Sequence, residues 1–354
     1  MKIDLEHSPS ARLLVLSAAF IILVAGMRAA ETLLVPFLLS IFIAVICGPA
    51  LFWMQKRGVP LVVAMLLVIA FVVVLAMLIA ALVGSSVDDF SRNVPHYQAR
   101  LHSQMSGLTT WLAGMGVPLP SELLANQLDP AKVMKLVASL LKGFTGALTN
   151  TFLILLTVIF ILMEAASFPT KLRSVLNDPA SSMSGFESFA ENLKRYMVIK
   201  TITSLATGIL VALWLMILGV DYPLLWGLLA FMLNYVPSIG SIIAAVPVVL
   251  LALIQLGPGT MLLVVIGYVV VNVVIGSIIE PRFMGKGLGL SALVVFLSLV
   301  FWGWVLGPVG MLLSVPLTMT VKIALDSNAD TRWIAVLLGP AHLPERTTTN
   351  SDAA

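Results

Sequence analysis

Long apolar runs dominate this sequence, and several of them reach the roughly 20 residues that an α-helix needs to cross the hydrocarbon core of a bilayer. Only 10% of the residues are charged and 60% are hydrophobic, whereas about 25% of the residues in an ordinary soluble domain are charged. The sequence therefore predicts an all-α, polytopic transmembrane helical bundle. The apolar runs cover residues 11–28, 32–54, 61–84, 146–166, 200–219, 223–256, 260–279 and 288–325.

Two of these runs, 223–256 and 288–325, are too long for one straight crossing and are interrupted inside. Proline removes a backbone donor and glycine weakens a helix, and in lipid the freed backbone groups must bond to protein or to water. We therefore expect two hairpin-like segments whose breaks face the protein interior. The predicted hinge or break residues near the second one are Gly285, Gly289, Gly303, Gly307, Pro308 and Gly310.

The alternation of apolar and polar stretches predicts six regions. Between the membrane runs, one stretch combines charges and turn signals with apolar residues at helical spacing, and another carries an apolar stripe beside basic residues, as a surface helix does. The predicted regions are N-terminal transmembrane helices (1–84), an extramembrane helical subdomain (85–145), a transmembrane helix (146–166), a cytoplasmic amphipathic surface helix (167–199), a C-terminal transmembrane core (200–326) and a cytoplasmic tail (327–354).

The basic residues indicate which side of the membrane each loop faces. With a cytoplasmic N-terminus and two hairpins, most of the 20 lysines and arginines lie on the cytoplasmic side, as the positive-inside rule requires. Single crossings would place Arg282 and Lys286 outside and weaken this asymmetry. We therefore expect residues 257–259 outside and Lys286 inside.

The sequence also argues against several classes of chemistry. The histidines His7, His96, His102 and His342 lie outside the apolar runs, which disfavours an embedded zinc site or a serine–histidine pair. The chain has no phosphate-binding P-loop, and its single cysteine, Cys47, has no partner within the chain. We expect a protein that is not an enzyme, carries no cofactor or metal and binds no nucleic acid.

Polar residues at membrane depth are sparse, and one group surrounds the break in the first long run. Asn234, Ser238 and Ser241 would share one face of a continuous helix, and the broken backbone around Pro237 and Gly240 can present unpaired carbonyl and amide groups. These residues are candidates for a hydrogen-bonding pathway for a small polar solute.

A second group lies on the run 260–279, where Asn272 and Glu280 fall within about 80° of each other on a helix. Asn272 is a further pathway candidate. Glu280, with neighbouring Arg282, is the candidate for proton or sodium coupling, because ionisable groups near membrane depth are costly and often functional. The structural alternative is that the asparagines bridge helices and that Glu280 pairs with Arg282 or Lys286.

These segments carry a resemblance that extends over nearly the whole chain. The chain resembles the autoinducer-2 exporter family of bacterial inner-membrane proteins, and most closely its TqsA-like branch. The similar segments are Val35–Phe37, Trp226–Phe231, Asn234–Gly240, Glu280–Gly285, Leu288–Ser291, Phe301–Trp304 and Gly307–Leu317.

The resemblance implies a multi-pass transporter or facilitator of the bacterial cell inner membrane. It also implies outward movement of a small polar solute, with the quorum-sensing signal autoinducer-2 as that solute, and assembly as a homo-oligomer in contact with membrane lipid. Two alternatives stay open. One is a sodium (cation)/proton antiporter that uses Glu280, and the other is a non-transporting membrane scaffold whose surface helix recruits partners.

Overall fold

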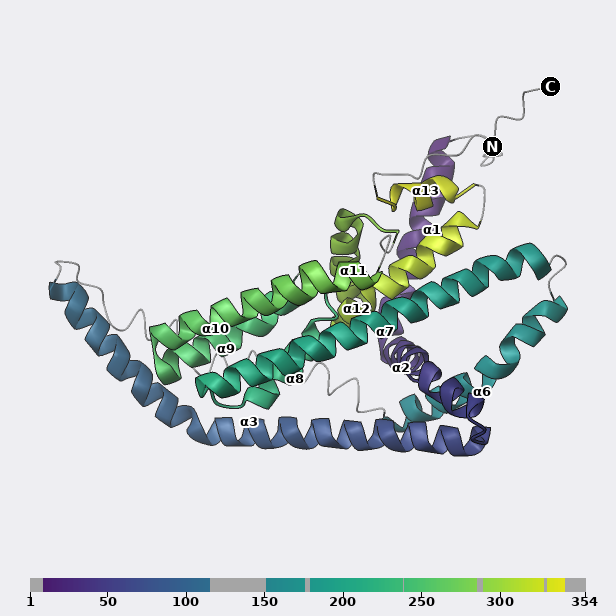
Figure 1. The fold of residues 1–354 in the computed structure, drawn as a ribbon. Helices are drawn as coiled ribbons and strands as arrows, with labels where there is room; N and C mark the ends of the chain where they lie inside the picture. The colour runs from purple at the N-terminus through teal and green to yellow at the C-terminus, as the bar shows by residue number, and fades with distance from the viewer. Residues whose placement is uncertain are drawn as a thin grey trace, which may run out of the picture.

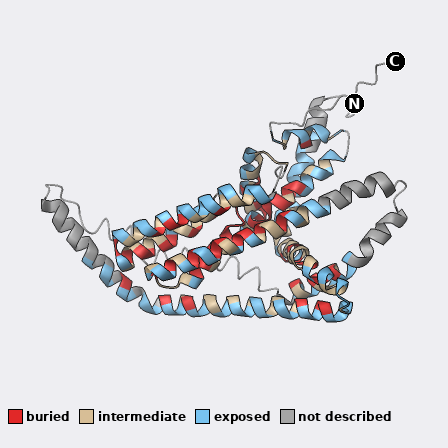
Figure 2. Cartoon of the chain, viewed as in Figure 1, coloured by how far each residue is buried: buried red, intermediate tan, exposed pale blue. Residues whose placement is uncertain are grey.

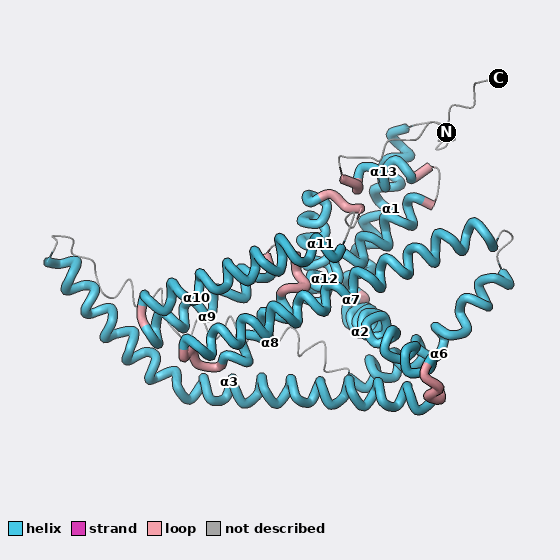
Figure 3. Tube along the Cα trace, in the orientation of Figure 1, coloured by secondary structure: helices cyan, strands magenta, loops and turns pink. Residues whose placement is uncertain are grey.

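The computed structural model describes residues 9–114, 151–175, 179–237, 239–284, 289–327 and 330–340. Within these ranges every regular element is a helix and there is no strand (Figure 3), which confirms the predicted fold class. Five helices of the described part are long and apolar enough to cross a membrane. They are Glu31–Lys56, Leu61–Phe90, Ala190–Leu218, Pro258–Phe283 and Ala292–Asp326.

The N-terminal helices are α1 (Pro9–Ala29), α2 (Glu31–Lys56) and α3 (Leu61–Gly114), and α2 packs against α6 (Thr151–Val175). A buried serine fastens this pair, because Ser40 Oγ lies 2.7 Å from the carbonyl oxygen of Pro36 and 3.2 Å from that of Ile154. Helix α2 thereby links α6 to the rest of the bundle.

Helix α3 continues well past the predicted end of its membrane run. Its 54 residues extend unbroken through Pro95 to Gly114, along one edge of the molecule (Figure 1). The start of the predicted extramembrane region is therefore the second half of this helix, and residues 115–150 lie outside the described part of the chain.

The second half of α3 is fastened to the body of the protein by hydrogen bonds. Tyr97 Oη donates to Asp221 Oδ2 at 2.6 Å, and Arg100 Nη1 donates to the carbonyl oxygen of Gln255 at 2.6 Å. Burial, together with the neighbouring Asp221, raises the pKa of the Tyr97 phenol above its usual value. The phenol therefore stays protonated and can act as the donor.

The body of the protein is built on α7 (Pro179–Leu218) and α8 (Pro223–Leu233), which lie side by side (Figure 1). The predicted boundary at residue 199 falls within α7, which is one continuous helix. Gly208 and Gly227 face each other so closely that a Cβ added at Gly208 would lie 2.7 Å from the Gly227 carbonyl oxygen. Small residues let membrane helices approach in this way.

The first long run folds as a hairpin of α8 and α9 (Gly240–Leu256), and α10 (Pro258–Val271) then returns alongside α9 (Figure 1). Buried residues gather along the facing sides of α7, α8, α9 and α10, whereas the outward faces are exposed (Figure 2). The exposed faces are rich in large apolar side chains, as expected for helices in contact with lipid.

The second long run, α12 (Ala292–Asp326), also reverses. Gly307 has a φ of 63° and breaks the helix, and Trp302 Nε1 donates to Thr318 Oγ1 at 3.0 Å, 16 residues away. A straight helix would separate these residues by about 24 Å. The last helix of the described residues is α13 (Arg332–Leu337), which packs on α12. Both hairpin-like segments of the predicted fold class are therefore present, and their orientation across a membrane stays a prediction.

Candidate functional site

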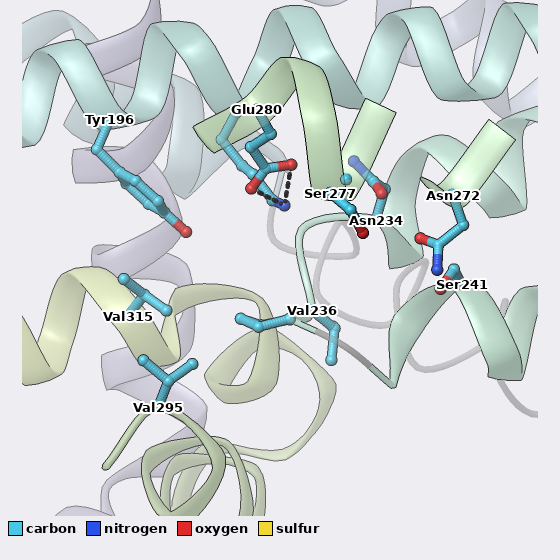
Figure 4. Close-up of a pocket in the computed structure, with 12 residues that line it drawn as sticks. Tyr196, Asn234, Val236, Ser241, Asn272, Ser277, Glu280, Val295 and Val315 are labelled. Carbon is cyan, nitrogen blue, oxygen red and sulfur yellow. Dashed lines mark hydrogen bonds and ion pairs between the residues drawn. The ribbon is translucent and has the colours of Figure 1, made fainter. Parts of the chain in front are cut away.

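A cavity of about 350 Å³ lies where α7, the α8–α9 break, the segment that follows α10, and α12 meet (Figure 4). In this view Asn272 and Ser241 lie toward one side of the cavity, and Tyr196 and Glu280 toward the other. Val295 and Val315, from the two arms of α12, supply an apolar wall. Segments far apart in the sequence thus contribute to one site.

The break between α8 and α9 supplies one polar part of the lining. Asn234 directly follows the last residue of α8; it is buried, and its Nδ2 donates to Ser204 Oγ of α7 at 3.0 Å. Val236, Pro237 and Ser241 follow along the cavity. Asn234 therefore bridges two helices, as the structural alternative proposed, and it also lines the cavity.

Gly240 has a role different from the one expected for it. It does not line the cavity, and a Cβ added there would lie 1.8 Å from the carbonyl oxygen of Leu233. The glycine allows the start of α9 to pack against the end of α8. A glycine is therefore needed at this position for backbone packing in the hairpin.

The opposite wall is a π-helix that the sequence analysis did not predict. It comprises Asn272–Ile279, and the Glu280 N–H donates to the carbonyl oxygen of Ile275, five residues earlier. Asn272, Gly276 and Ser277 line the cavity from this element. π-Helical turns are rare, and they occur frequently at functional sites.

Directly after the π-helix, α11 (Glu280–Met284) begins with a carboxylate that is paired inside the protein. Lys200 Nζ of α7 lies 2.7 and 2.9 Å from the two carboxylate oxygens of Glu280 (Figure 4). The side chains of Lys200 and Glu280 are only 6% and 15% exposed. The structural alternative paired Glu280 with Arg282 or Lys286. In the structure the partner is Lys200 from another helix, the Arg282 side chain is exposed, and Lys286 lies outside the described residues.

The structure gathers part of the predicted site and leaves part of it elsewhere. Asn234, Pro237, Ser241, Asn272 and Glu280 line one cavity. The remaining candidates fall into two groups. Gly289, Gly303, Gly307, Pro308 and Gly310 belong to the α12 hairpin and its start and do not line the cavity, whereas Ser238, Gly285 and Lys286 lie outside the described residues.

Tyr196, Lys200, Val236, Gly276 and Ser277 are lining residues that sequence reasoning missed. Lys200 is the most informative of them. It stands 80 residues from Glu280 at the start of an apolar run, where a basic residue is usually explained by membrane topology. A lysine near a membrane run without a local acidic partner is a weak signal that could have drawn attention to it.

The cavity is lined by hydrogen-bonding groups and carries no net charge. Amide and hydroxyl groups of Asn272, Ser241 and Ser277 line it, and the Lys200–Glu280 pair contributes no net charge. Among the described residues, no group of three or more His, Cys, Asp or Glu side chains could hold a metal ion. The arrangement can bind a small, neutral solute that carries several hydroxyl or carbonyl groups.

Comparison with known proteins agrees with this architecture. A family profile described as AI-2E family transporter matches residues 17–329. The chain belongs to the AI-2E transporter family. It is 41% identical over 327 residues to the AI-2 transport protein TqsA of Escherichia coli (strain K12), a match that covers 92% of this chain and 95% of TqsA.

Two further relatives of this transporter are described as putative transport proteins. One, from Haemophilus influenzae, is 43% identical over 328 residues, which cover 91% of this chain and 94% of the relative. The other, YhhT of Escherichia coli (strain K12), is 37% identical over 329 residues, covering 93% and 94%. The protein is thus a multi-pass transporter of the bacterial inner membrane, and the family resemblance seen in the sequence is confirmed.

Proposed function

We propose that this AI-2E family transporter exports autoinducer-2 and that the cavity beside Lys200 and Glu280 is its solute site. The observation that carries the proposal is the lining of the cavity, which combines several neutral hydrogen-bonding groups with one compensated ion pair. Autoinducer-2 is a hydroxyl-rich, furanose-like molecule, so such a lining suits it. The similarity to TqsA, described as an AI-2 transport protein, supports the same solute.

The position of the cavity also supports a transport site. Its polar walls are the α8–α9 break and the π-helix, two places where regular helical hydrogen bonding is interrupted. In many secondary transporters the solute binds near the middle of the membrane at such discontinuous helices. The cavity volume of about 350 Å³ falls in the range of small-molecule sites.

The proposal also includes assembly as a homo-oligomer and coupling of transport through Glu280. The most apolar windows of the five long helices bury no more than 39% of their residues inside one chain, which leaves apolar faces for lipid and for further copies in a homo-oligomer. Glu280 is the proposed coupling group, because it is the one carboxylate among the described residues that line the cavity.

The test is flux of labelled autoinducer-2 from proteoliposomes that contain the purified full chain, with and without a proton gradient. We expect saturable efflux above that of protein-free liposomes, and about tenfold slower efflux for Asn272→Leu, because the loss of one or two hydrogen bonds to the solute weakens binding by roughly 1 to 2 kcal/mol. The absence of saturable efflux in the wild type would refute the proposal.

The matched control for that variant is Asn93→Leu. Asn93 is also an exposed asparagine, and its amide donates to Tyr222 Oη at 3.0 Å, outside the cavity. Its efflux should equal that of the wild type. Equal losses in both variants would show that the effect at Asn272 is not specific to the cavity.

A further inference from the structure

The cavity contains one positive and one negative side chain, and they neutralise each other. Of the described residues that line the cavity, only Lys200 and Glu280 are charged. The lysine Nζ contacts both carboxylate oxygens, at 2.7 and 2.9 Å, and Lys200 is buried. The two residues come from α7 and α11, so the charge balance of the site depends on how these helices pack.

A second lysine of the same helix has no such role. Lys194 lies on α7 less than two turns before Lys200, and its Nζ is 3.4 Å from Glu191. Its side chain is 45% exposed and does not line the cavity. Solvent can therefore stabilise either of these charges, and the loss of Lys194 leaves no buried ion.

Loss of Lys200 has a different consequence, because its partner Glu280 lines the polar cavity and is largely shielded from solvent. Leaving one charge of a buried pair uncompensated is strongly unfavourable, and a lone ion near membrane depth attracts an opposite charge. The cavity provides room for a counter-ion together with amide and hydroxyl groups that can bind it. An unpaired Glu280 would thus create a cation site, and an unpaired Lys200 would create an anion site.

We propose that Lys200 determines the charge selectivity of the solute site, because its ammonium group neutralises Glu280 and so restricts the cavity to uncharged, hydrogen-bonding solutes. The inference rests on the proposed function in assigning this cavity to solute passage. It adds a residue from α7, where the sequence predicted no site residue, and it explains how a carboxylate can line the pathway without admitting cations.

The experiment uses the full-length wild type and variants in proteoliposomes at pH 8, with labelled sodium and labelled chloride as probes. Wild type should pass neither ion faster than protein-free liposomes. Lys200→Gln should raise sodium uptake at least about tenfold, the effect of a difference of about 1.4 kcal/mol, and leave chloride uptake unchanged. Glu280→Gln should raise chloride uptake and leave sodium uptake unchanged.

Two further variants complete the design. Lys194→Gln is the matched control and should behave as wild type toward both ions, since its charge lies outside the cavity. The exchange of the two charges in Lys200→Glu/Glu280→Lys should return both ion fluxes toward the wild-type level, because the pair is again neutral.

Several results would overturn the proposal. Folded Lys200→Gln with wild-type sodium uptake would do so, as would an equal increase in Lys194→Gln. If only one of the two single variants accumulates as folded protein, the proposal stands when that variant shows its expected increase in ion uptake and fails when it does not. If neither accumulates, the pair serves folding and the proposal fails. Autoinducer-2 efflux of the wild type is measured in the same liposomes, so a failure of the proposed function is seen separately.

Discussion

The close contact between Gly208 of α7 and Gly227 of α8 predicts a measurable packing penalty for an added methyl group. A Cβ at Gly208 would lie 2.7 Å from the Gly227 carbonyl oxygen and 2.8 Å from Phe231 Cβ, whereas ordinary contacts begin at 3.4 Å. To reach an ordinary contact, the helices would have to move apart until the distance from this Cβ to the carbonyl oxygen grew from 2.7 to 3.4 Å. Overpacking of this kind costs roughly 1 to 3 kcal/mol.

Alanine also stabilises a helix relative to glycine by about 1 kcal/mol, and this gain would mask part of the packing penalty. Gly208→Ala is therefore compared with a second glycine-to-alanine variant instead of with the wild type. Gly84 of α3 provides the matched control, because a Cβ there would meet nothing within 4 Å. We expect Gly208→Ala to be less stable than Gly84→Ala by roughly 1 to 3 kcal/mol when reversible unfolding is measured in mixed detergent micelles.

A functional measurement accompanies the stability measurement. Separation of α7 from α8 would lengthen the 3.0 Å hydrogen bond from Asn234 Nδ2 to Ser204 Oγ at the cavity, so autoinducer-2 efflux should fall in Gly208→Ala and not in Gly84→Ala. If the free energies of unfolding of the two variants agree within about 0.5 kcal/mol, the usual effect of a neutral surface change, the packing argument is refuted.

Three further predictions concern the walls of the cavity. Gly240→Ala should lower the yield of folded protein, because the added Cβ would lie 1.8 Å from the Leu233 carbonyl oxygen. The control Gly259→Ala, whose Cβ would meet nothing within 4 Å, should not lower it. Equal yields of the two variants would contradict this prediction. Deletion of Val274 should convert the π-helix to a regular α-helix and reduce efflux by displacing Asn272 and Ser277; unchanged efflux in folded protein would show that the π-helix is dispensable. Glu280→Gln removes the titratable proton and should abolish gradient-driven efflux while preserving exchange at equal pH; full gradient-driven efflux would eliminate Glu280 as the coupling group.

The parts of the fold that the sequence predicts are those controlled by local pattern. Apolar runs identify the membrane helices, and the Pro237 region and Gly307 identify breaks, because proline and glycine act on the backbone where they stand. Asn272 and Glu280 could be chosen for a similar reason, since polar residues are conspicuous in an apolar helix. Their common cavity is visible only after the helices have packed.

The features that escaped prediction depend on distant contacts or on small changes of helical twist. Glu280 has the basic residue Arg282 two positions away, yet its partner is Lys200, 80 residues earlier, because α11 packs against α7. The π-helix differs from an α-helix by its i→i+5 bonding, and residue propensities contain no clear signal for that difference. Gly240 was misassigned because a glycine near a proline suits an open, unwound site and a tight hairpin equally well.

The two helix irregularities and the ion pair are parts of one arrangement. A regular membrane helix satisfies its own backbone and leaves an apolar surface toward its neighbours, so a polar cavity requires places where that regularity fails. The α8–α9 break and the π-helix are two such places, and both contribute residues that line the cavity. Lys200 then makes it possible for the Glu280 carboxylate to line the same cavity, because the ammonium group compensates a charge that is costly to bury alone. A change to a cavity-lining residue of any one of these elements should therefore alter which solutes pass.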